Sequence, residues 1–247
     1  MTRQSILFTI VPLGSVLVVA SALTAVLAGF GTRWTWWDFR TGFLILRWSA
    51  YAGLTGALVC GLGLAGSFRT GTSGIVVLAL AGLLVGLAIF GIPWSWMRAA
   101  KQVPPIHDIT TDTNDPPQFV AIMSVRKNAL NPAEYGGTDI AAQQRKAYPE
   151  VQTLLLNVPA ASAFDTARAV AAGMGWEIVD ADRTAGRIEA TDTTFWFGFK
   201  DDIVIRVRPD KAGSRVDLRS VSRVGKSDIG TNAKRIMNFL SRLQKGQ

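Results

Sequence analysis

Three long apolar runs dominate the first hundred residues, at 6–30, 42–66 and 74–97. A helix needs about 20 residues to cross the hydrocarbon core of a bilayer, so each run is long enough to span it. The connections at 31–41 and 67–73 are short, which predicts an up-down-up bundle of three membrane helices. The first run exceeds the roughly 7 to 15 apolar residues of a signal-peptide core, and two more runs follow it. We therefore interpret it as an uncleaved helix.

The pattern changes after this transmembrane domain, which we assign to residues 1–100. Residues 101–119 are rich in proline and aspartate and show no hydrophobic period, which predicts an extended strap that leaves the membrane. We assign residues 120–247 to a soluble domain. Its first thirty residues have a weak pattern and indicate only a short helix at 138–148, capped by Thr138.

Regular periodicity begins at residue 153. The predicted elements are a strand (153–158), a helix (160–173), strands at 176–182 and 186–194, two strands within 201–223 that join at a turn (210–213), and a helix (228–243). Short turns between the late strands indicate antiparallel pairing. The order predicts an α+β soluble domain with a mainly antiparallel sheet, covered by helices on one face.

Alternation in the last two strands predicts what the two faces of this sheet carry. Ile203 and Ile205 point to one face, and Arg206 points to the other. If Arg208 lies opposite Arg215, then Arg206 lies opposite Asp217 and Val204 opposite Arg219. One face is therefore expected to be the core, and the other a lattice of arginines and carboxylates. We favour a solvated face with cross-strand ion pairs over the alternative, an anion-binding platform.

The distribution of charge argues against a nucleic-acid partner. The chain has 26 Lys and Arg against 18 Asp and Glu, a net charge of +8. Seven basic residues and one acidic residue lie in the membrane domain and at its end (Lys101), so most of the excess flanks apolar segments. A nucleic-acid-binding protein would concentrate the excess in its soluble domain. The partner that this pattern predicts is the lipid bilayer.

Tryptophans mark one end of the membrane helices. Trp34, Trp36 and Trp37 follow the first run, whereas Trp94 and Trp96 end the third, so all five belong on the same side of the membrane. Tryptophan at such positions is typical of an interfacial belt.

Small residues recur at helix-packing spacing inside the runs: Gly53, Ala57 and Gly61 in the second, and Gly82 and Gly86 in the third. They predict close contact between helices.

The distribution of charge only weakly indicates the orientation of the protein in the membrane. Arg33, Arg40, Arg47, Arg98 and Lys101 share the side that carries the soluble domain, and Arg3 and Arg69 share the other. Arg47 can lie at the boundary of its span. The count favours a cytoplasmic soluble domain, but the first helix alone is nearly balanced, so either side stays open. We expect a multi-pass protein of the cell membrane, of the bacterial inner-membrane type.

Metal and cofactor sites are not predicted. Cys60 and His107 are the only cysteine and the only histidine, so neither can complete a metal shell with residues of its kind. A calcium loop counted from Asp108 has Thr113 where glycine is required and Phe119 where glutamate is required.

The segment "RSVSRVGKSDIGTNAKRI" (219–236) resembles the end of a nucleotide-binding P-loop at Gly225-Lys226-Ser227. The first glycine of that motif is replaced by Ser220, and the context is an antiparallel strand, so we reject a P-loop. The segment predicts a strand-turn-helix corner in which Ser227 or Asp228 caps the last helix. A second unusual segment, "FWFGF" (195–199), is compatible with core packing, a small pocket or contact with the bilayer surface.

Two stretches, "GRIEATDTTFWFGFKDDIVIRVRP" and "GSRVDLRSVSRVGKSDIGTNAKRI", resemble the domain of unknown function catalogued as 1499, and the strap "PPIHDITTDTNDPPQF" resembles the opening segment of that family. The resemblance covers roughly 105–243, and three preceding spans resemble one architecture of the family. It implies recurring positions but no activity, because none is established for the family. Those positions are Asp201, Asp202, Arg219, Ser222, Arg223, Gly225, Ser227, Asp228, Gly230, Asn232 and Arg235.

Two classes of function remain open. The first is a non-enzymatic, membrane-anchored module that binds a protein partner or an anionic ligand. Its candidate ligand-binding residues are Arg206, Arg219, Ser222, Arg223, Lys226, Asp228, Asn232 and Arg235. The alternative is a membrane-tethered enzyme that uses Asp201 and Asp202, or Asp192, with Arg219 and Arg223. Adjacent aspartates in a strand point to opposite faces, which weakens a catalytic pair. No catalytic residue is assigned, and transport is not favoured because the spans lack a polar lining.

Overall fold

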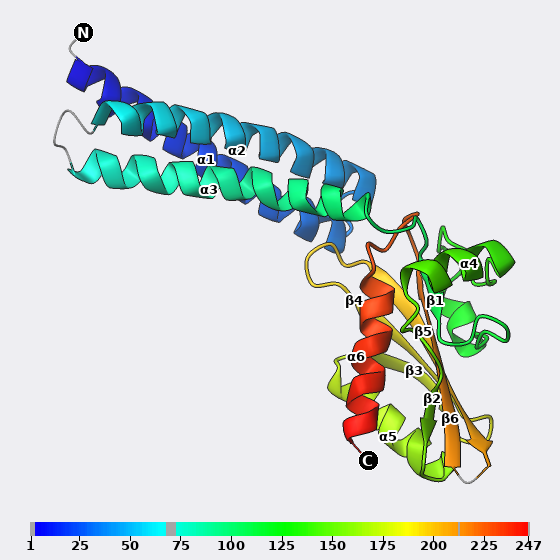
Figure 1. Ribbon diagram of the computed structural model, residues 1–247. Coiled ribbons are helices and arrows are strands. Elements are labelled where there is room, and N and C mark those ends of the chain that lie inside the picture. Colours follow the sequence, from blue (N-terminus) through cyan, green and yellow to red (C-terminus); the bar gives the residue numbers. More distant parts are fainter. Residues whose placement is uncertain (1–2, 68–72, 212, 247) are drawn as a thin grey trace. The chain divides into compact units, whose positions relative to one another are not determined.

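The computed structural model describes residues 3–67, 73–211 and 213–246, with the backbone alone at 3–7. The chain forms two compact units. The first contains residues 1–99 together with the loop Phe195–Gly198, and the second contains the remaining residues. Figure 1 shows the elements of both.

The first unit is built from three long helices, α1 (Arg3–Arg33), α2 (Phe39–Ser67) and α3 (Ser73–Ala100). All three are long and apolar enough to cross a membrane, so the prediction of three spans is confirmed. Asp38 starts α2, because its carboxylate accepts the backbone N–H groups of Arg40 (2.7 Å) and Thr41 (3.2 Å). Arg69 and the side chain of Arg3, which entered the charge count, lie outside the described residues.

Small residues bring α2 and α3 into close contact, as their spacing predicts. A Cβ added at Gly86 would lie 2.5 Å from the carbonyl oxygen of Gly53 and 2.8 Å from the Cβ of Ala57. One added at Gly82 would lie 2.5 Å from the sulfur of Cys60. Lipid supplies no hydrophobic drive for helix association, so this close backbone packing is what holds the two helices together.

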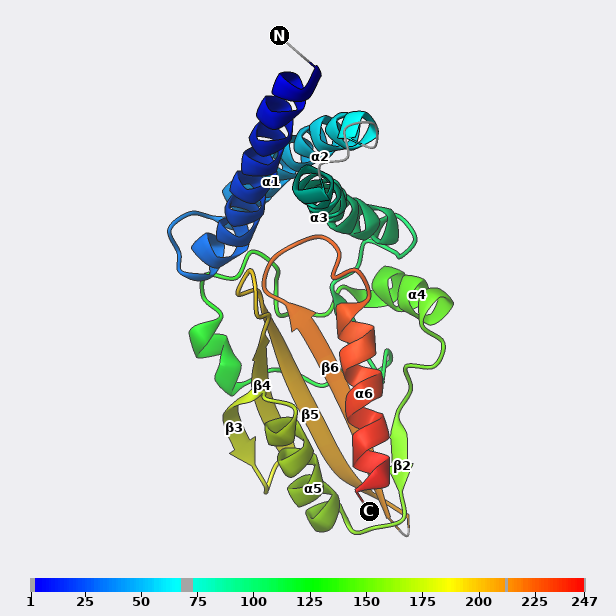
Figure 2. The same ribbon diagram turned by 90° about the vertical axis from the view of Figure 1, so that its left-hand side faces the viewer.

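The second unit contains one antiparallel sheet (Figures 1 and 2). Its strands are β1 (Asp108–Thr110), β2 (Leu154–Leu156), β3 (Glu177–Asp182), β4 (Arg187–Thr193), β5 (Lys200–Asp210) and β6 (Gly213–Ser222). The order is β1-β6-β5-β4-β3, and β2 pairs with the other end of β6. The helices are α4 (Gly137–Ala147), α5 (Ala160–Gly173) and α6 (Thr231–Lys245), with a short 3-10 helix, η1 (Ala121–Val125). The predicted α+β class is confirmed.

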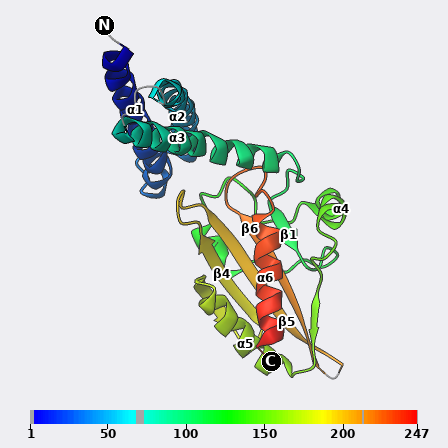
Figure 3. The ribbon, with the colours of Figure 1, turned by 60° about the vertical axis from the view of Figure 1, so that its left-hand side comes forward.

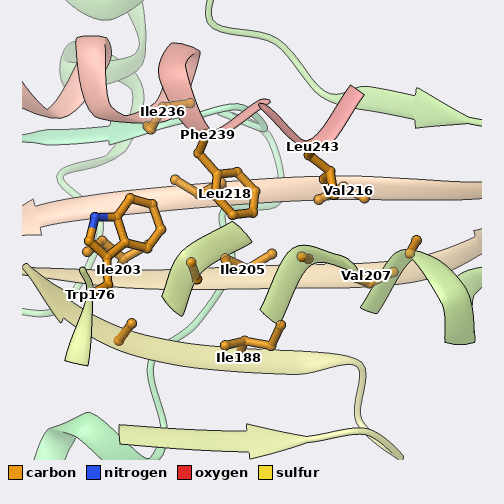
Figure 4. Close-up of a cluster of buried hydrophobic side chains, with 14 of the residues drawn as sticks. Trp176, Ile188, Ile203, Ile205, Val207, Val216, Leu218, Ile236, Phe239 and Leu243 are labelled. Carbon is orange, nitrogen blue, oxygen red and sulfur yellow. The ribbon is translucent and has the colours of Figure 1, made fainter. Parts of the chain in front are cut away.

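The core lies between the sheet and the two helices α5 and α6, which cover one face (Figures 2 and 3). Ile203 and Ile205 of β5 and Leu218 of β6 are fully buried there, as the alternation predicts. Trp176 stacks on Phe239 of α6 with ring centroids 5.4 Å apart, and both rings belong to the core between the helices and the sheet (Figure 4).

The β5–β6 hairpin has the predicted register. Arg208 lies opposite Arg215, Arg206 opposite Asp217, and Val204 opposite Arg219. In a hairpin the turn between the strands sets the register, and the burial of side chains on the sheet keeps it from slipping.

The extended strap contains a strand that was not predicted, because Asp108 to Thr110 pair with β6 as β1. Two local predictions are wrong. Helix α4 begins at Gly137, and its start has no side-chain cap, so Thr138 does not serve as one. Helix α6 begins at Thr231 rather than Asp228, after Gly230 in a left-handed conformation (φ 77°).

Candidate functional site

One end of the sheet gathers most of the residues that the sequence singled out. Strand β5 begins there, strands β4 and β6 end there, and β1 and α6 begin there. We call this the tethered end, because the chain from α3 enters the sheet here through β1. The segment 222–232, which links β6 to α6, is called the corner (Figure 2).

The arginine face of the sheet is buried, so the prediction of a solvated face is wrong. Val204, Glu189, Asp217 and Arg219 have 1% or less of their surface exposed. Residues from the segment 111–135 cover them: Phe119 and Ile122 form a small apolar cluster with Val204 and Val221.

Glu189 anchors this covering segment. Its carboxylate accepts the backbone N–H groups of Val120 (2.8 Å), Ala121 (3.2 Å) and Ile122 (2.8 Å) at the start of η1. Arg187 Nε lies 2.8 Å from the same carboxylate. The start of the short helix is thus satisfied by an anion of the protein itself.

Arg219 is the largest fully buried side chain of the chain's described part. Its guanidinium donates two hydrogen bonds to Asp108, at 2.9 and 2.7 Å, and others to the carbonyls of Ala133 (2.7 Å) and Pro117 (3.3 Å). It also lies over the rings of Phe119 and Tyr135. Burial raises the pKa of Tyr135 to about 12, and the Asp108 carboxylate adds to the shift while Arg219 opposes it.

Arg206 lies elsewhere on the same face, away from the corner. It pairs with Asp217 (2.9 Å), Asp112 (3.3 Å) and Asp115 (3.0 Å), and Arg215 joins Asp112 and Asp217. Burial acts to raise the pKa of Asp217, but hydrogen bonds from Arg215, Thr153 and Arg206 outweigh it and hold that pKa below its usual value. The structure therefore does not bring Arg206 together with the other candidate residues.

Asp202 and Arg223 meet at the tethered end of this face. Arg223 donates to the fully buried Asp202 through Nε (2.9 Å) and Nη2 (2.8 Å), and Arg126 donates from the opposite side at 2.5 Å. Thr191 supplies a further hydrogen bond to the carboxylate, at 2.9 Å. The charge on Asp202 is thus fully matched by neighbouring donors.

Asp201, the next residue, belongs to the opposite face. It accepts a hydrogen bond from Arg235 of α6 at 2.6 Å, and Asp192 shares the same guanidinium at 2.8 Å. The prediction that the adjacent aspartates point to opposite faces is therefore confirmed.

A chain of side-chain amides and hydroxyls ties the corner to β6. Asn232 accepts from Ser220 (2.7 Å) and from Arg235, and it donates to Ser222 (3.0 Å) and to the carbonyl of His107 (3.0 Å). Asn232, Ser220 and Ser222 are buried, so these bonds satisfy groups that water does not reach.

Asp228 satisfies the first turn of α6 without being its N-cap residue. Its carboxylate accepts the N–H groups of Gly230 (2.9 Å) and Asn232 (2.8 Å). Burial raises the pKa of Asp228 more than these two bonds lower it. Ser227 has a smaller part, accepting the N–H of Ile229 at 3.2 Å.

Two features of the corner are unusual for a loop. Ile229 has φ 55°, a left-handed conformation that a β-branched side chain rarely adopts. The Tyr148 hydroxyl is buried and has no hydrogen-bond partner among the described residues. A Cβ added at Gly230 would lie 3.2 Å from this hydroxyl, so it faces the corner. Strain of this kind persists only where the surroundings enforce it.

The groups of the corner that remain for an external ligand are few. Lys226 is exposed and forms no ion pair within the described chain, and the same holds for Lys200 at the start of β5. The backbone N–H groups of residues 224–227 donate to no other described residue. The donors that the corner leaves without an internal partner are therefore the Lys226 ammonium and the backbone N–H groups of residues 224–227, while Gly225 and Ile229 are also exposed there.

Sequence reasoning missed the ion-pair partners of the candidate residues: three aspartates that neutralise arginines, and one arginine that pairs with Asp202. Asp108, Asp112 and Asp115 come from the strap, and Arg126 comes from the segment with the weak pattern. The available signal was the number of aspartates in the strap. Within the part of the chain that the structure describes, no cluster of His, Cys, Asp and Glu is arranged to hold a metal ion.

Comparison with known proteins agrees with this architecture. No curated protein matches the chain. The model of one family, described as protein of unknown function (DUF1499), matches residues 108–243, from the first residue of β1 to a point near the end of α6. The match covers more than half of the chain and the whole sheet. The chain therefore belongs to the DUF1499 family of proteins of unknown function, in a form with three preceding membrane helices.

Proposed function

We propose that the protein is a membrane-anchored binding module whose corner binds a phosphate-bearing anion at the membrane surface. The proposal rests on a difference between the hydrogen-bond donors at the tethered end: some have partners within the protein, and others have none. Arg219, Arg223 and Arg235 are each neutralised by an internal carboxylate. Lys226 is exposed and has no ion-pair partner, and the N–H groups of residues 224–227 have no acceptor among the described residues. Backbone donors beside a lysine are a common way to hold phosphate oxygens.

The length of the linker supports a ligand at the membrane surface. Ile106 accepts the N–H of Asp228 (3.3 Å), and His107 accepts that of Ser222 (3.0 Å), so the strap holds the corner. Only residues 101–105 lie between the end of α3 and Ile106. Six residue steps span at most about 20 Å when fully extended. The corner thus works close to a cell membrane, which we take to be of the bacterial inner-membrane type.

Catalysis by Asp201 and Asp202 is less well supported. The two carboxylates lie on opposite faces of the sheet. Asp202 is held by Arg126 and Arg223 at 2.5 and 2.8 Å, and Asp201 by Arg235 at 2.6 Å. A general acid or base needs a free path to its substrate and a pKa near the working pH. Neither aspartate has the open side that such a role requires.

The test uses the full chain in lipid nanodiscs and follows amide hydrogen exchange of residues 223–230. Three preparations are compared: discs of zwitterionic lipid, discs that contain phosphatidylglycerol, and zwitterionic discs with added inorganic phosphate. Protection in the second alone identifies a lipid headgroup as the ligand, whereas protection in the third identifies a soluble phosphate group. Equal exchange in all three preparations would overturn the proposal.

A further inference from the structure

The loop between β4 and β5 carries three aromatic residues that pack with the membrane helices rather than in the sheet's core. Phe195–Gly198 belongs to the first unit. The indole N–H of Trp196 donates to the carbonyl of Val26 in α1 at 3.0 Å, and Arg33 donates to the carbonyl of Phe195 at 3.1 Å. Phe197 is buried against Phe43 of α2, with ring centroids 5.0 Å apart.

Glycines make room for these rings. A Cβ added at Gly29 would overlap the indole of Trp196. One added at Gly42 would meet Thr32 Oγ1 (2.2 Å) and the carbonyl oxygen of Ala28 (2.9 Å) first, and then the ring of Phe197 (3.1 Å). The loop itself turns at Gly198, whose φ is 68°. The two aromatic side chains therefore occupy gaps that the helix sequences leave open, which is a fitted contact between the loop and the helices.

The depth of this contact follows from helix geometry. Val26 lies seven residues before Arg33, the end of the apolar helix, and at 1.5 Å per residue this is about 10 Å along its axis. The interfacial layer on each side of the hydrocarbon core is roughly 5 to 8 Å thick. The distance exceeds the thickness of that layer, so a ring hydrogen-bonded to Val26 lies at least as deep as interfacial tryptophans do.

Phe195 is the one ring of the loop that is left uncovered. It is 79% exposed, although it contacts Phe30 edge to face at 5.5 Å. Exposed aromatic side chains continue the surface around it: Trp34 stacks on Phe30, and Trp96 lies 5.9 Å from Trp196. An exposed phenylalanine next to such a belt, at the end of helices that can span a membrane, fits an apolar environment.

We propose that the β4–β5 loop is a fourth membrane element, in which Trp196 and Phe197 seat the loop on α1 and α2 while Phe195 enters the interface of the lipid bilayer. The occupant of the exposed surface is lipid, because the surface is continuous with the aromatic ends of the spanning helices. The chain then meets the membrane a second time, after the linker that follows α3.

The experiment measures the depth of residue 195 in the full chain. Cys60, the only cysteine, is replaced by alanine, and Phe195→Cys is labelled with an environment-sensitive fluorophore in vesicles that contain headgroup-level nitroxide lipids. The matched control is Leu155→Cys on β2, which is also exposed (63%). We expect lipid quenching and loss of iodide quenching at 195, with the reverse at 155. Equal accessibility to iodide at the two sites would overturn the proposal.

A second variant tests the contact between Trp196 and helix α1. Gly29→Leu fills the space of the Trp196 indole, so the lipid quenching at 195 should fall to the level of the Leu155 control. Gly91→Leu in α3 is the matched substitution, because a Cβ at Gly91 meets no atom within 4 Å. It should leave the quenching unchanged, and far-UV circular dichroism verifies that both variants keep their helices. Unchanged lipid quenching in the Gly29→Leu variant would contradict the proposed role of the Trp196–α1 contact.

Discussion

Replacing Arg219 by methionine should destabilise the soluble unit severely. The substitution keeps a long side chain between Phe119 and Tyr135 but removes the guanidinium that pairs with Asp108 at 2.9 and 2.7 Å. The Asp108 side chain is 7% exposed, so its charge would be left buried and unpaired. Removing one partner of a buried ion pair costs about 3–5 kcal/mol, and the carbonyls of Pro117 and Ala133 would also lose a donor.

Hydrogen exchange of the β5 and β6 amides in nanodiscs measures this loss, because the central amides exchange only when the sheet opens. A loss of 3–5 kcal/mol predicts exchange that is faster by roughly two to four orders of magnitude. Arg208→Met is the control: Arg208 pairs with Asp115 at the surface, so its loss should cost about 1 kcal/mol or less.

The double variant Asp108→Leu/Arg219→Met tests the cause. It removes the unpaired carboxylate together with the arginine, and an apolar replacement of both partners is often neutral. We expect it to recover most of the lost protection. If Arg219→Met behaved like Arg208→Met, then Arg219 would not be an internal ion-pair partner, and a role in ligand binding would have to be reconsidered.

Three further predictions follow from the same contacts. Glu189→Gln leaves η1 with weaker acceptors for the N–H groups of Val120 to Ile122 and should cost about 1–3 kcal/mol, seen first as faster exchange of residues 120–125. The pKa of Asp217 is lowered in the folded chain, so its contribution to stability is present above the ordinary pKa near 3.9 and is lost as the pH falls below it. Thermal unfolding followed from about pH 5 down to about pH 2 should show this loss, and Asp217→Asn should reduce it. Gly86→Leu should separate α2 from α3, because a Cβ there lies 2.5 Å from Gly53 O, whereas Gly91→Leu should not; a disulfide-crosslinking series across the two helices distinguishes them.

The periodic parts of the chain were predictable because their own residues decide their structure. Unbroken apolar length predicted the three spans, and the alternation around Ile203 and Ile205 predicted which residues share a face of the sheet. The register of the hairpin followed only once Arg208 was placed opposite Arg215, and that pairing is observed. Helix α5 (160–173) was predicted with its observed bounds, since its apolar stripe is regular and Pro159 precedes it.

The environment of the arginines was not predictable in the same way. Arg219 pairs with Asp108, which lies 111 positions away in a strap without periodicity. The segment that covers the arginine face has no hydrophobic period, because Glu189 and buried arginines hold it in place of an apolar stripe. The charged face of the strands was therefore predicted to be exposed to solvent. In the structure, carboxylates from a distant segment of the chain neutralise its arginines. The candidate ligand-binding residues stay predictions. Because the arginines are paired internally, Lys226 is the stronger candidate among them for contact with a ligand.

The most direct test of the proposed function is the Lys226→Gln variant of the full chain in nanodiscs that contain phosphatidylglycerol. A lysine near an anionic surface contributes about 1 kcal/mol, so the protection of residues 223–230 from hydrogen exchange should fall about fivefold. Lys245→Gln, at the far end of α6, should leave the protection as it is in the unmodified chain. Protection that is the same in both variants and in the unmodified chain would contradict the account.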